Sequence, residues 1–417
     1  MDIERNEYLS KLINRKKNGL IKIVTGVRRC GKSYLLFKLF YQHLILENIA
    51  EDHIIDIQLD DFKNRKLLNP DILYEYVTSK IVDGDDYYIL LDEIQLVENF
   101  ESVLNGFLHI SNTDIYVTGS NSRFLSSDII TEFRGRGDEI RVYPLTFREF
   151  MSVYDGTLEE GWKQYFTYGG MPLVLSQKGD NAKADYLNRL FEQTYLTDII
   201  NRHNLRGNDE IGEVTNILAS AVGSLTNPLK LSNTFRSVKG INMSPQTVSN
   251  YLEYLQDSFL VDRAIRYDIK GKKYINTPQK YYFTDVGLRN ARLNFRQQEE
   301  NHIMENVIFN ELKCRGYSVD VGIVQTSTRG MDGKKVRKQL EVDFVANQRD
   351  RRYYIQSAFE IGTPEKMMQE QNSFLHIDDS FKKIMVVRDS IIPWHNEKGF
   401  LIVGLIDFLL KPEMMDM

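Results

Sequence analysis

The sequence has few cysteines, no long apolar run and no strong excess of either charge. Two cysteines among 417 residues cannot build a disulfide framework or a zinc site, and the seven histidines include no H-E-x-x-H pair. The most apolar late stretch, residues 400–410, is interrupted by Asp407 and is too short to span a bilayer. The first six residues are too charged to begin a secretory signal. We therefore expect a cytoplasmic protein with free thiols and no membrane partner.

The composition is that of a globular chain with more than one core. Hydrophobic residues make up 42% and charged residues 27% of the chain, as in ordinary globular proteins. A chain of 417 residues exceeds the size of a single core, so we expect two or three domains. The net charge of −5 gives no overall attraction to nucleic acid, so such contact would need a local basic patch.

Residues 26–33 contain the most informative motif, a complete G-x-x-x-x-G-K-[ST] phosphate-binding loop. An apolar strand pattern precedes it at residues 20–24, and a helical pattern follows at residues 33–40. In such a loop the backbone N–H groups cradle phosphates, the lysine reaches the β- and γ-phosphates, and the hydroxyl can ligate Mg²⁺. The expected nucleotide-binding residues are Gly26, Val27, Arg28, Arg29, Cys30, Gly31, Lys32, Ser33 and Tyr34.

A second motif consists of the apolar residues 88–91 followed by two carboxylates, Asp92 and Glu93. In a parallel sheet these acids are expected beside the phosphate loop, about 60 residues earlier in the chain. We expect Asp92 and Ser33 to hold Mg²⁺, and Glu93 to orient and polarise the attacking water. Lys32 and Glu93 are therefore predicted catalytic residues.

Two further segments supply candidates for the same site. Residues 115–122 predict a strand that ends in small polar side chains, of which Ser120 and Asn121 could sense the γ-phosphate through a water. Arg134 and Arg136 lie in a Gly-rich basic turn, and either could neutralise charge during phosphoryl transfer, in cis or from a neighbouring subunit. An ordinary polar turn and a solvated basic turn remain the alternatives.

The order of elements predicts an α/β fold that begins with a parallel sheet covered by helices. Helical patterns dominate residues 150–235, and a helix beginning at Pro245 precedes two strand patterns at 261–267 and 281–284. Helices followed by a hairpin favour a winged helix-turn-helix, with residues 245–255 in the recognition-helix position. The strands expected in the first sheet are 20–24, 54–59, 88–91, 115–118 and 140–143.

The recognition-helix position carries no basic residue, so DNA binding and simple packing remain equal interpretations of the winged helix. From residue 300 a helix and further strands predict a second α/β unit. The basic stretch at 333–338 is expected to be a loop between strands. The predicted domains are 1–150 (P-loop ATPase), 151–235 (helical), 236–295 (winged helix) and 296–417 (C-terminal α/β).

Short segments along nearly the whole chain match one known family in order. They are residues 26–33, 90–93, 118–122, 135–136, 144–150, 168–172, 195–199, 283–289 and 341–344. In these segments the chain resembles prokaryotic AAA-type ATP-binding proteins that join a P-loop module to a winged helix and a C-terminal domain related to PD-(D/E)XK nucleases. The resemblance implies an ATPase with a nucleic-acid connection, and the choice of adenine over guanine also depends on it.

The nuclease part of the resemblance implies a set of metal ligands in the C-terminal domain. Glu305 fits the helix acid, Asp343 with Glu341 fits the strand acid, and Gln356 fits the third ligand. The position of the lysine is occupied by Ala358, which removes a cationic group that the chemistry needs. We therefore interpret this domain as nuclease-like but inactive, unless a lysine from elsewhere in the chain restores the site.

The leading hypothesis is an Mg²⁺-dependent ATPase whose nucleotide state is relayed to the winged-helix and nuclease-like half. One alternative is a nucleotide-gated regulator that binds double-stranded DNA and hydrolyses little. Another is a DNA-cleaving protein of defence or mobile elements. The sequence leaves the physiological partner and the oligomeric state open, including a homo-oligomer.

Overall fold

The computed structural model describes residues 2–119, 135–205, 209–240, 242–296, 299–329 and 335–417. The chain divides into two compact units, residues 1–145 with 257–259, and residues 146–256 with 260–417. The first boundary lies five residues before the expected domain end at residue 150. No helix among the described residues is long and apolar enough to cross a membrane.

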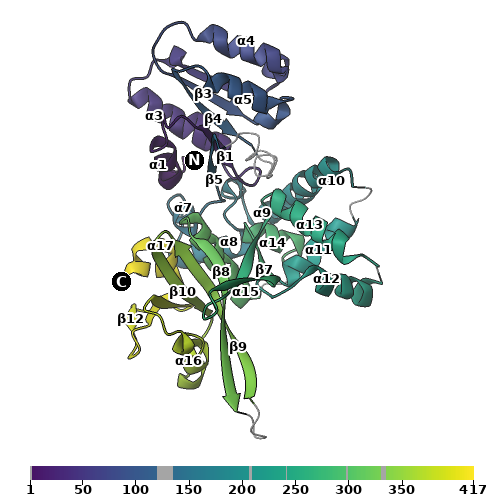
Figure 1. Cartoon of the computed structure of the whole chain (residues 1–417), viewed down its shortest axis with the longest axis vertical. Coiled ribbons are helices and arrows are strands. Elements are labelled where there is room, and N and C mark those ends of the chain that lie inside the picture. Colours follow the sequence, from purple (N-terminus) through teal and green to yellow (C-terminus); the bar gives the residue numbers. More distant parts are fainter. Residues whose placement is uncertain (1, 120–134, 206–208, 241, 297–298, 330–334) are drawn as a thin grey trace. The chain divides into compact units, whose positions relative to one another are not determined.

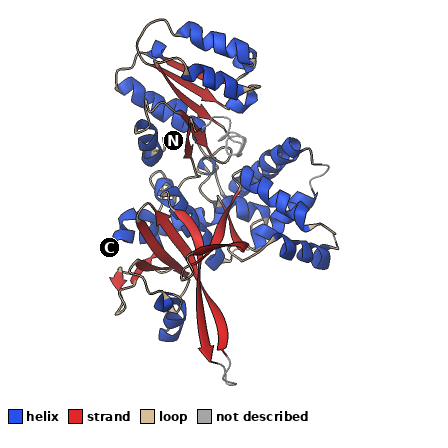
Figure 2. Cartoon of the chain, in the orientation of Figure 1, coloured by secondary structure: helices blue, strands red, loops and turns tan. Residues whose placement is uncertain are grey.

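The first unit contains a five-stranded parallel sheet with helices on both of its faces (Figures 1 and 2). The strand order is β2-β3-β4-β1-β5, so the last two strands in sequence flank the first. The strands are β1 (Ile21–Thr25), β2 (Ile54–Gln58), β3 (Tyr87–Asp92), β4 (Thr113–Thr118) and β5 (Gly137–Arg141). The helices are α1 (Asn6–Ile13), α2 (Lys32–Tyr34), η1 (Leu35–Phe40), α3 (Tyr41–Leu46), α4 (Pro70–Lys80) and α5 (Phe100–Leu108).

All five strands lie where the apolar runs predict them, within a few residues. The helix after the phosphate loop is longer than expected, since η1 and α3 continue it with a π-helical middle. One face of the sheet packs α4 and α5 in an apolar core that includes Leu73, Leu91 and Phe107, each fully buried. Burial on both faces explains why the residues of β1 and β3 are all buried and mostly apolar, whereas β2 and β5 include exposed polar residues.

The second unit combines a helical region with an eight-stranded mixed sheet. Its helices are α7 (Phe147–Met151), α8 (Leu158–Tyr168), α9 (Asp180–Arg189), η7 (Leu190–Leu196), α10 (Thr197–His203), α11 (Asp209–Ser220), α12 (Pro228–Thr234), η8 (Phe235–Lys239), α13 (Pro245–Asp257), α14 (Val286–Arg292), α15 (Glu300–Cys314), α16 (Pro364–Gln371) and α17 (Leu405–Leu410). Its strands are β6 (Val261–Asp268), β7 (Lys273–Phe283), β8 (Ser318–Arg329), β9 (Lys335–Gln348), β10 (Arg351–Ala358), β11 (Lys382–Val387), β12 (Trp394–His395) and β13 (Leu401–Gly404).

The β6–β7 hairpin belongs to the same sheet as the C-terminal strands, in the order β12-β13-β11-β10-β9-β8-β6-β7 (Figure 1). Residues 266–268 of β6 pair in parallel with residues 321–323 of β8. The helix and hairpin expected for a winged helix are present, but the boundary that we place at residue 295 does not separate two sheets. The pairing joins segments more than 50 residues apart, and local sequence patterns do not encode such contacts.

The α8–α14 contact joins two of the segments that carry the family resemblance. The carboxylate of Asp285 accepts hydrogen bonds from the backbone N–H groups of Gly170 (2.7 Å) and Leu288 (2.9 Å). A Cβ atom on Gly287 would lie 2.0 Å from the carbonyl oxygen of Tyr168, so only glycine permits this approach. Burial raises the pKa of Asp285 to about 6, although its backbone hydrogen bonds lower it. These residues therefore hold the helical region on α14.

Candidate functional site: the phosphate loop and a buried lysine cluster

The phosphate loop connects β1 to α2 along a path that requires glycine at two positions. Gly26 has a φ of 134° and Gly31 a φ of 102°, values that side chains disfavour. A Cβ atom on Gly26 would lie 2.1 Å from the carbonyl oxygen of Val142. The loop is therefore pressed against the segment that follows β5, and its shape depends on both glycines.

Lys32 and Ser33 occupy the first turn of the helix that follows the loop. The Lys32 ammonium is buried and donates to the carbonyl oxygens of Gly26 (3.0 Å) and Val27 (3.2 Å). It therefore lies across the loop, where a bound anion would also gain from the positive end of the helix. This donor set fits the phosphates of a nucleotide.

Asp92, the last residue of β3, reaches the helix of the phosphate loop although β4 lies between β3 and β1. The Ser33 hydroxyl donates to Asp92 Oδ1 over 3.1 Å. Thr118, the last residue of β4, donates to the same carboxylate and accepts a hydrogen bond of 3.0 Å from the backbone N–H of Glu93. Thr118 thus bridges the two acids, a role that the sequence analysis did not assign.

Asp92 is buried, whereas Glu93 is only half-buried. Burial raises the pKa of Asp92, and its hydrogen bonds from Thr118 and Ser33 offset only part of this effect. A buried carboxylate beside a hydroxyl is a suitable donor pair for Mg²⁺, which prefers oxygen ligands. Glu93 is half-buried, has a left-handed backbone (φ 51°), and accepts a hydrogen bond from the Gln95 side chain.

The other predicted loop residues divide into packed and exposed positions. Val27 and Cys30 are buried, and the Cys30 thiol lies 3.4 Å from the carbonyl oxygen of Val142. Tyr34 accepts a hydrogen bond from the backbone of Ile3, so its hydroxyl faces the N-terminal segment. The remaining two positions of the loop, Arg28 and Arg29, are exposed.

The buried Arg5 also supports the loop, and the sequence analysis missed it. Its guanidinium donates to the carbonyl oxygens of Cys30 (3.2 Å) and Tyr143 (2.7 Å). It thereby ties the phosphate loop to the segment that follows β5. No local motif could have identified this residue, because its partners lie 25 and 138 residues further along the chain.

The structure does not bring Arg136 to the phosphate loop. Its backbone carbonyl pairs with Ile21 at the start of β1, whereas the loop follows the end of that strand. Five strand residues span roughly 16 Å, too far for an arginine side chain to cross. Arg136 is exposed and contacts Asn105, so as a finger it could act only on the nucleotide of another subunit. The other candidates, Arg134, Ser120 and Asn121, lie outside the described residues.

A second site lies in the second unit, around the buried side chain of Lys280 on β7. The Lys280 ammonium lies 2.8 Å from Glu305 Oε1, 2.8 Å from Glu341 Oε1 and 3.8 Å from Asp343 Oδ1. Asp343 Oδ2 also accepts hydrogen bonds from the Gln356 amide and from a backbone N–H, each of 2.8 Å. The acids that the resemblance implies, from α15 and β9, thus converge on one lysine, and Gln356 from β10 contacts the carboxylate of Asp343.

The lysine of this cluster does not come from the expected position. Ala358 is fully buried and packs with apolar residues of β11 and β13, such as Met385 and Ile402. Lys280 instead enters from the hairpin that joins the C-terminal sheet. Nothing in the local sequence marks Lys280, because its role depends on the long-range pairing of β6 with β8.

Strong electrostatic coupling holds the lysine cluster together. Burial opposes the charged form of Lys280, but the charges of Glu305, Asp343 and Glu341 outweigh it and raise its pKa. Burial also raises the pKa of Asp343, with a further contribution from the charge of Glu305. With all three carboxylates ionised the cluster would carry a formal charge of −2, and this excess of negative charge contributes to the raised pKa of Asp343.

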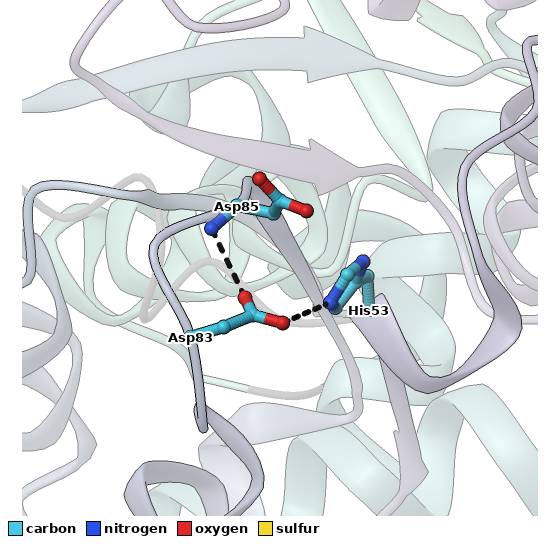
Figure 3. A group of neighbouring side chains, drawn as sticks. All are labelled: His53, Asp83 and Asp85. Atoms are coloured by element: carbon cyan, nitrogen blue, oxygen red, sulfur yellow. Dashed lines mark hydrogen bonds and ion pairs between the residues drawn. The ribbon is translucent and has the colours of Figure 1, made fainter.

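A third group, His53, Asp83 and Asp85, lies near the start of β2 and β3 (Figure 3). His53 Nε2 is 3.2 Å from Asp83 Oδ2, and the backbone N–H of Asp85 donates to the other oxygen of Asp83 over 3.0 Å. Both aspartates are exposed. These hydrogen bonds stabilise the turn between α4 and β3. The turn lies where β2 and β3 begin, whereas the phosphate loop lies where β1 ends.

Two family models match the chain. An AAA domain matches residues 18–151, and a domain of unknown function (DUF8612) matches residues 159–299. The first match covers the parallel sheet, the phosphate loop and both acids of the site. The second match covers most of the helical region and the β6–β7 hairpin. Fold, site and the first match together define the class, a P-loop protein of the AAA type.

Relatives with similar sequences extend over most of the chain. A Haemophilus influenzae protein, named only as uncharacterized, is 34% identical over 415 residues, which cover 98% of this chain and 99% of that protein. Uncharacterized protein MJ1544 of Methanocaldococcus jannaschii is 28% identical and covers 80% of this chain and 73% of its own. The chain belongs to the family of P-loop AAA proteins that includes the Haemophilus influenzae protein.

Two solved structures show a distant likeness to this chain. The Aeropyrum pernix ORC1 protein in complex with DNA aligns with a TM-score of 0.29 and 13% identity, over 70% of this chain and 92% of that one. Protein VC1899 of Vibrio cholerae aligns with a TM-score of 0.21 and 13% identity, over 94% of this chain and 90% of that one. At such scores, neither likeness bears on the function of this chain.

Proposed function

We propose that the chain is an Mg²⁺-dependent ATPase. The observation that carries the proposal is the contact between Ser33 on the loop helix and Asp92 at the end of β3. It brings a hydroxyl and a buried carboxylate together beside the lysine that spans the loop. Mg²⁺ held by these two oxygens would neutralise phosphate charge during transfer.

The chain's own residues divide the remaining work. The loop N–H groups and Lys32 bind and orient the phosphates. Glu93 accepts a proton from the attacking water and holds it in line. Thr118 is a positioning residue, since its hydroxyl fixes both the Asp92 carboxylate and the backbone of Glu93. Arg136 would act as an arginine finger only on a nucleotide bound by a neighbouring subunit.

Nucleotide binding can be tested separately from hydrolysis. We expect Lys32→Ala to lose at least tenfold in affinity for a fluorescent ATP analogue, because a charged donor to phosphate contributes about 1.5–3 kcal/mol. Lys38→Ala, further along the same helix, is the matched control and should bind as the wild type does. Equal binding by both variants would contradict the assignment of the loop.

We infer a second candidate function, metal-dependent cleavage of DNA, from the lysine cluster. The supporting observation is that Lys280 places an ammonium among the acids of α15 and β9. It supplies the cation that is missing at the expected lysine position, which Ala358 occupies. A divalent cation bound by Glu305 and Asp343 would match the formal charge of −2, and Lys280 would then be free to orient water. This reverses our interpretation of the domain as inactive.

The test is cleavage of supercoiled plasmid in Mg²⁺ or Mn²⁺. Wild type should nick the plasmid, and Asp343→Asn and Lys280→Gln should not. Glu397→Gln, an exposed acid on the same unit, is the control. Cleavage that survives in Asp343→Asn would assign the activity to a contaminant, and no cleavage by wild type would leave Lys280 as a structural cation only.

A further inference from the structure

His53, Asp83 and Asp85 form a group of three potential metal ligands in the first unit that neither proposed function uses (Figure 3). His53 directly precedes β2, and both aspartates lie in the turn between α4 and β3. The length of β3, roughly 17 Å, separates this turn from Asp92 at the other end of the strand. The group is therefore too far from the phosphate loop to share a metal ion with it.

The spacing of the ligand atoms suits a single metal ion. His53 Nε2 lies 3.2 Å from Asp83 Oδ2, and one oxygen of Asp85 lies within 4.8 Å of both ligand atoms. Two ligands that are each about 2.0–2.2 Å from a tetrahedral Zn²⁺ lie about 3.3 Å apart, so the first pair already has the separation that the ion needs. Asp85 is exposed, so its carboxylate can rotate to shorten the remaining distances.

The surrounding contacts orient the three ligands. The His53 ring packs edge-on against the ring of Tyr87, with centroids 4.4 Å apart, and the His53 side chain is only 15% exposed. The side-chain amide of Asn112 donates to the backbone carbonyls of Asp83 (3.2 Å) and Asp85 (2.7 Å). The backbone N–H of Asp85 donates to Asp83 Oδ1, which leaves Oδ2 directed at His53. A site whose ligands are already oriented loses less entropy when it binds a metal.

The charges of this group also favour a cation. Among the described residues, neither Asp83 nor Asp85 forms an ion pair with a lysine or an arginine, and His53 balances Asp83 only when its imidazole is protonated. The hydrogen bond between His53 and Asp83 accounts for one contact, but it leaves the Asp85 carboxylate without a side-chain partner in the described parts of the chain. With a neutral imidazole, the two carboxylates carry two negative charges, which one divalent cation cancels.

We propose that His53, Asp83 and Asp85 bind one Zn²⁺ ion, which links the start of β2 to the turn before β3. Zn²⁺ accepts imidazole nitrogen and carboxylate oxygen as ligands, and a water would complete its tetrahedral arrangement here. Mg²⁺ is a poorer match, because it prefers oxygen ligands in near-octahedral geometry. No local motif marks the site, because the histidine and the first aspartate are 30 residues apart. The site is independent of the phosphate loop and of the lysine cluster.

The test measures the Zn²⁺ affinity of the full chain by competition with a chromophoric chelator, after removal of bound metal with EDTA. Excess Mg²⁺ is present throughout, so that sites built from oxygen ligands alone are occupied. We expect the wild type to bind Zn²⁺ with a Kd of about 1 μM or below, and His53→Gln to bind it at least about tenfold more weakly, because the nitrogen ligand is lost. His109→Gln removes an exposed histidine elsewhere on the same unit and should bind as the wild type does.

A second variant guards against loss through misfolding. Asp85→Asn changes an exposed side chain and keeps the backbone hydrogen bonds of the turn, so it should fold and still bind Zn²⁺ at least about tenfold more weakly. Asp52→Asn, which changes an exposed acid next to His53, is its control. Zn²⁺ should raise the unfolding temperature of the wild type and of both controls, but not that of either site variant.

Three results would overturn the proposal. The first is a wild type with no Kd for Zn²⁺ below about 100 μM in excess Mg²⁺. The second is equal Zn²⁺ affinity in His53→Gln and His109→Gln, and the third is equal affinity in Asp85→Asn and Asp52→Asn.

Discussion

Replacing Lys280 by methionine should strongly destabilise the second unit, because it leaves three carboxylates without their cation. The ammonium is 4% exposed and lies 2.8 Å from two of the carboxylates and 3.8 Å from the third. Removing one partner of a buried ion pair costs about 3–5 kcal/mol. For a unit of this size, such a loss lowers the unfolding temperature by on the order of 10 °C.

The loss should depend on pH with a definite sign. The pKa of Asp343 is raised in the folded state, so stability from this group is present at low pH and is lost as pH rises. Without Lys280 the pKa of Asp343 rises further, because the charge of Lys280 lowers it, and the variant should lose more stability than wild type between pH 5 and pH 8. Adding Glu305→Gln should recover part of the loss, since fewer charges then lack a partner.

Differential scanning calorimetry in EDTA at pH 5 and pH 8 measures this effect. Lys398→Met, which removes an exposed lysine from the same unit, is the matched control. Equal unfolding temperatures for Lys280→Met and Lys398→Met at pH 8 would refute the description of the cluster as an ion-pair network that depends on Lys280.

Three further predictions follow from single contacts. Gly287→Ala should cost about 3 kcal/mol or more, because its Cβ would overlap the carbonyl of Tyr168, whereas Gly362→Ala, in open space, should be near neutral in urea unfolding. The pKa of Asp285 is about 6 in the folded chain, against an ordinary value of 3.8, so this carboxyl stabilises the fold below about pH 4. The free energy of unfolding should fall by about 3 kcal/mol as the pH rises from 4 to just above 6. In Asp285→Asn the free energy of unfolding should not show this dependence on pH. Thr118→Val should lower the rate of ATP hydrolysis by about tenfold to a hundredfold while nucleotide affinity stays within twofold, because its hydroxyl contacts the acids and not the loop.

The parts of the fold that depend on local patterns could be predicted from the sequence. The strand before Gly26, the helix after Lys32 and the strand before Asp92 are each defined by neighbouring residues, and the structure has all three. The α/β class follows from their alternation. The prediction that Asp92 lies close to Ser33 depended on the parallel sheet, since the carboxyl ends of its strands share one edge.

The parts that depend on long-range pairing could not be predicted. Strand β4 lies between β1 and β3, which gives Thr118 its bridging position, and no local pattern specifies that order. The β6–β7 hairpin joins the C-terminal sheet through β8, and only this pairing brings Lys280 to Glu305. Residue type alone makes Arg136 a candidate finger, but its pairing with Ile21 places it at the start of β1, whereas the phosphate loop follows the end of that strand.

Phosphate release from Mg²⁺-ATP by the purified chain, alone and with duplex DNA, decides whether the chain is an ATPase. We expect steady turnover by wild type and a loss of at least a hundredfold in Glu93→Gln, with nucleotide binding retained. Glu98→Gln, an exposed acid five residues further along, should keep the wild-type rate. Equal rates for Glu93→Gln and Glu98→Gln, or no release by wild type under either condition, would contradict the claim that this chain is an ATPase.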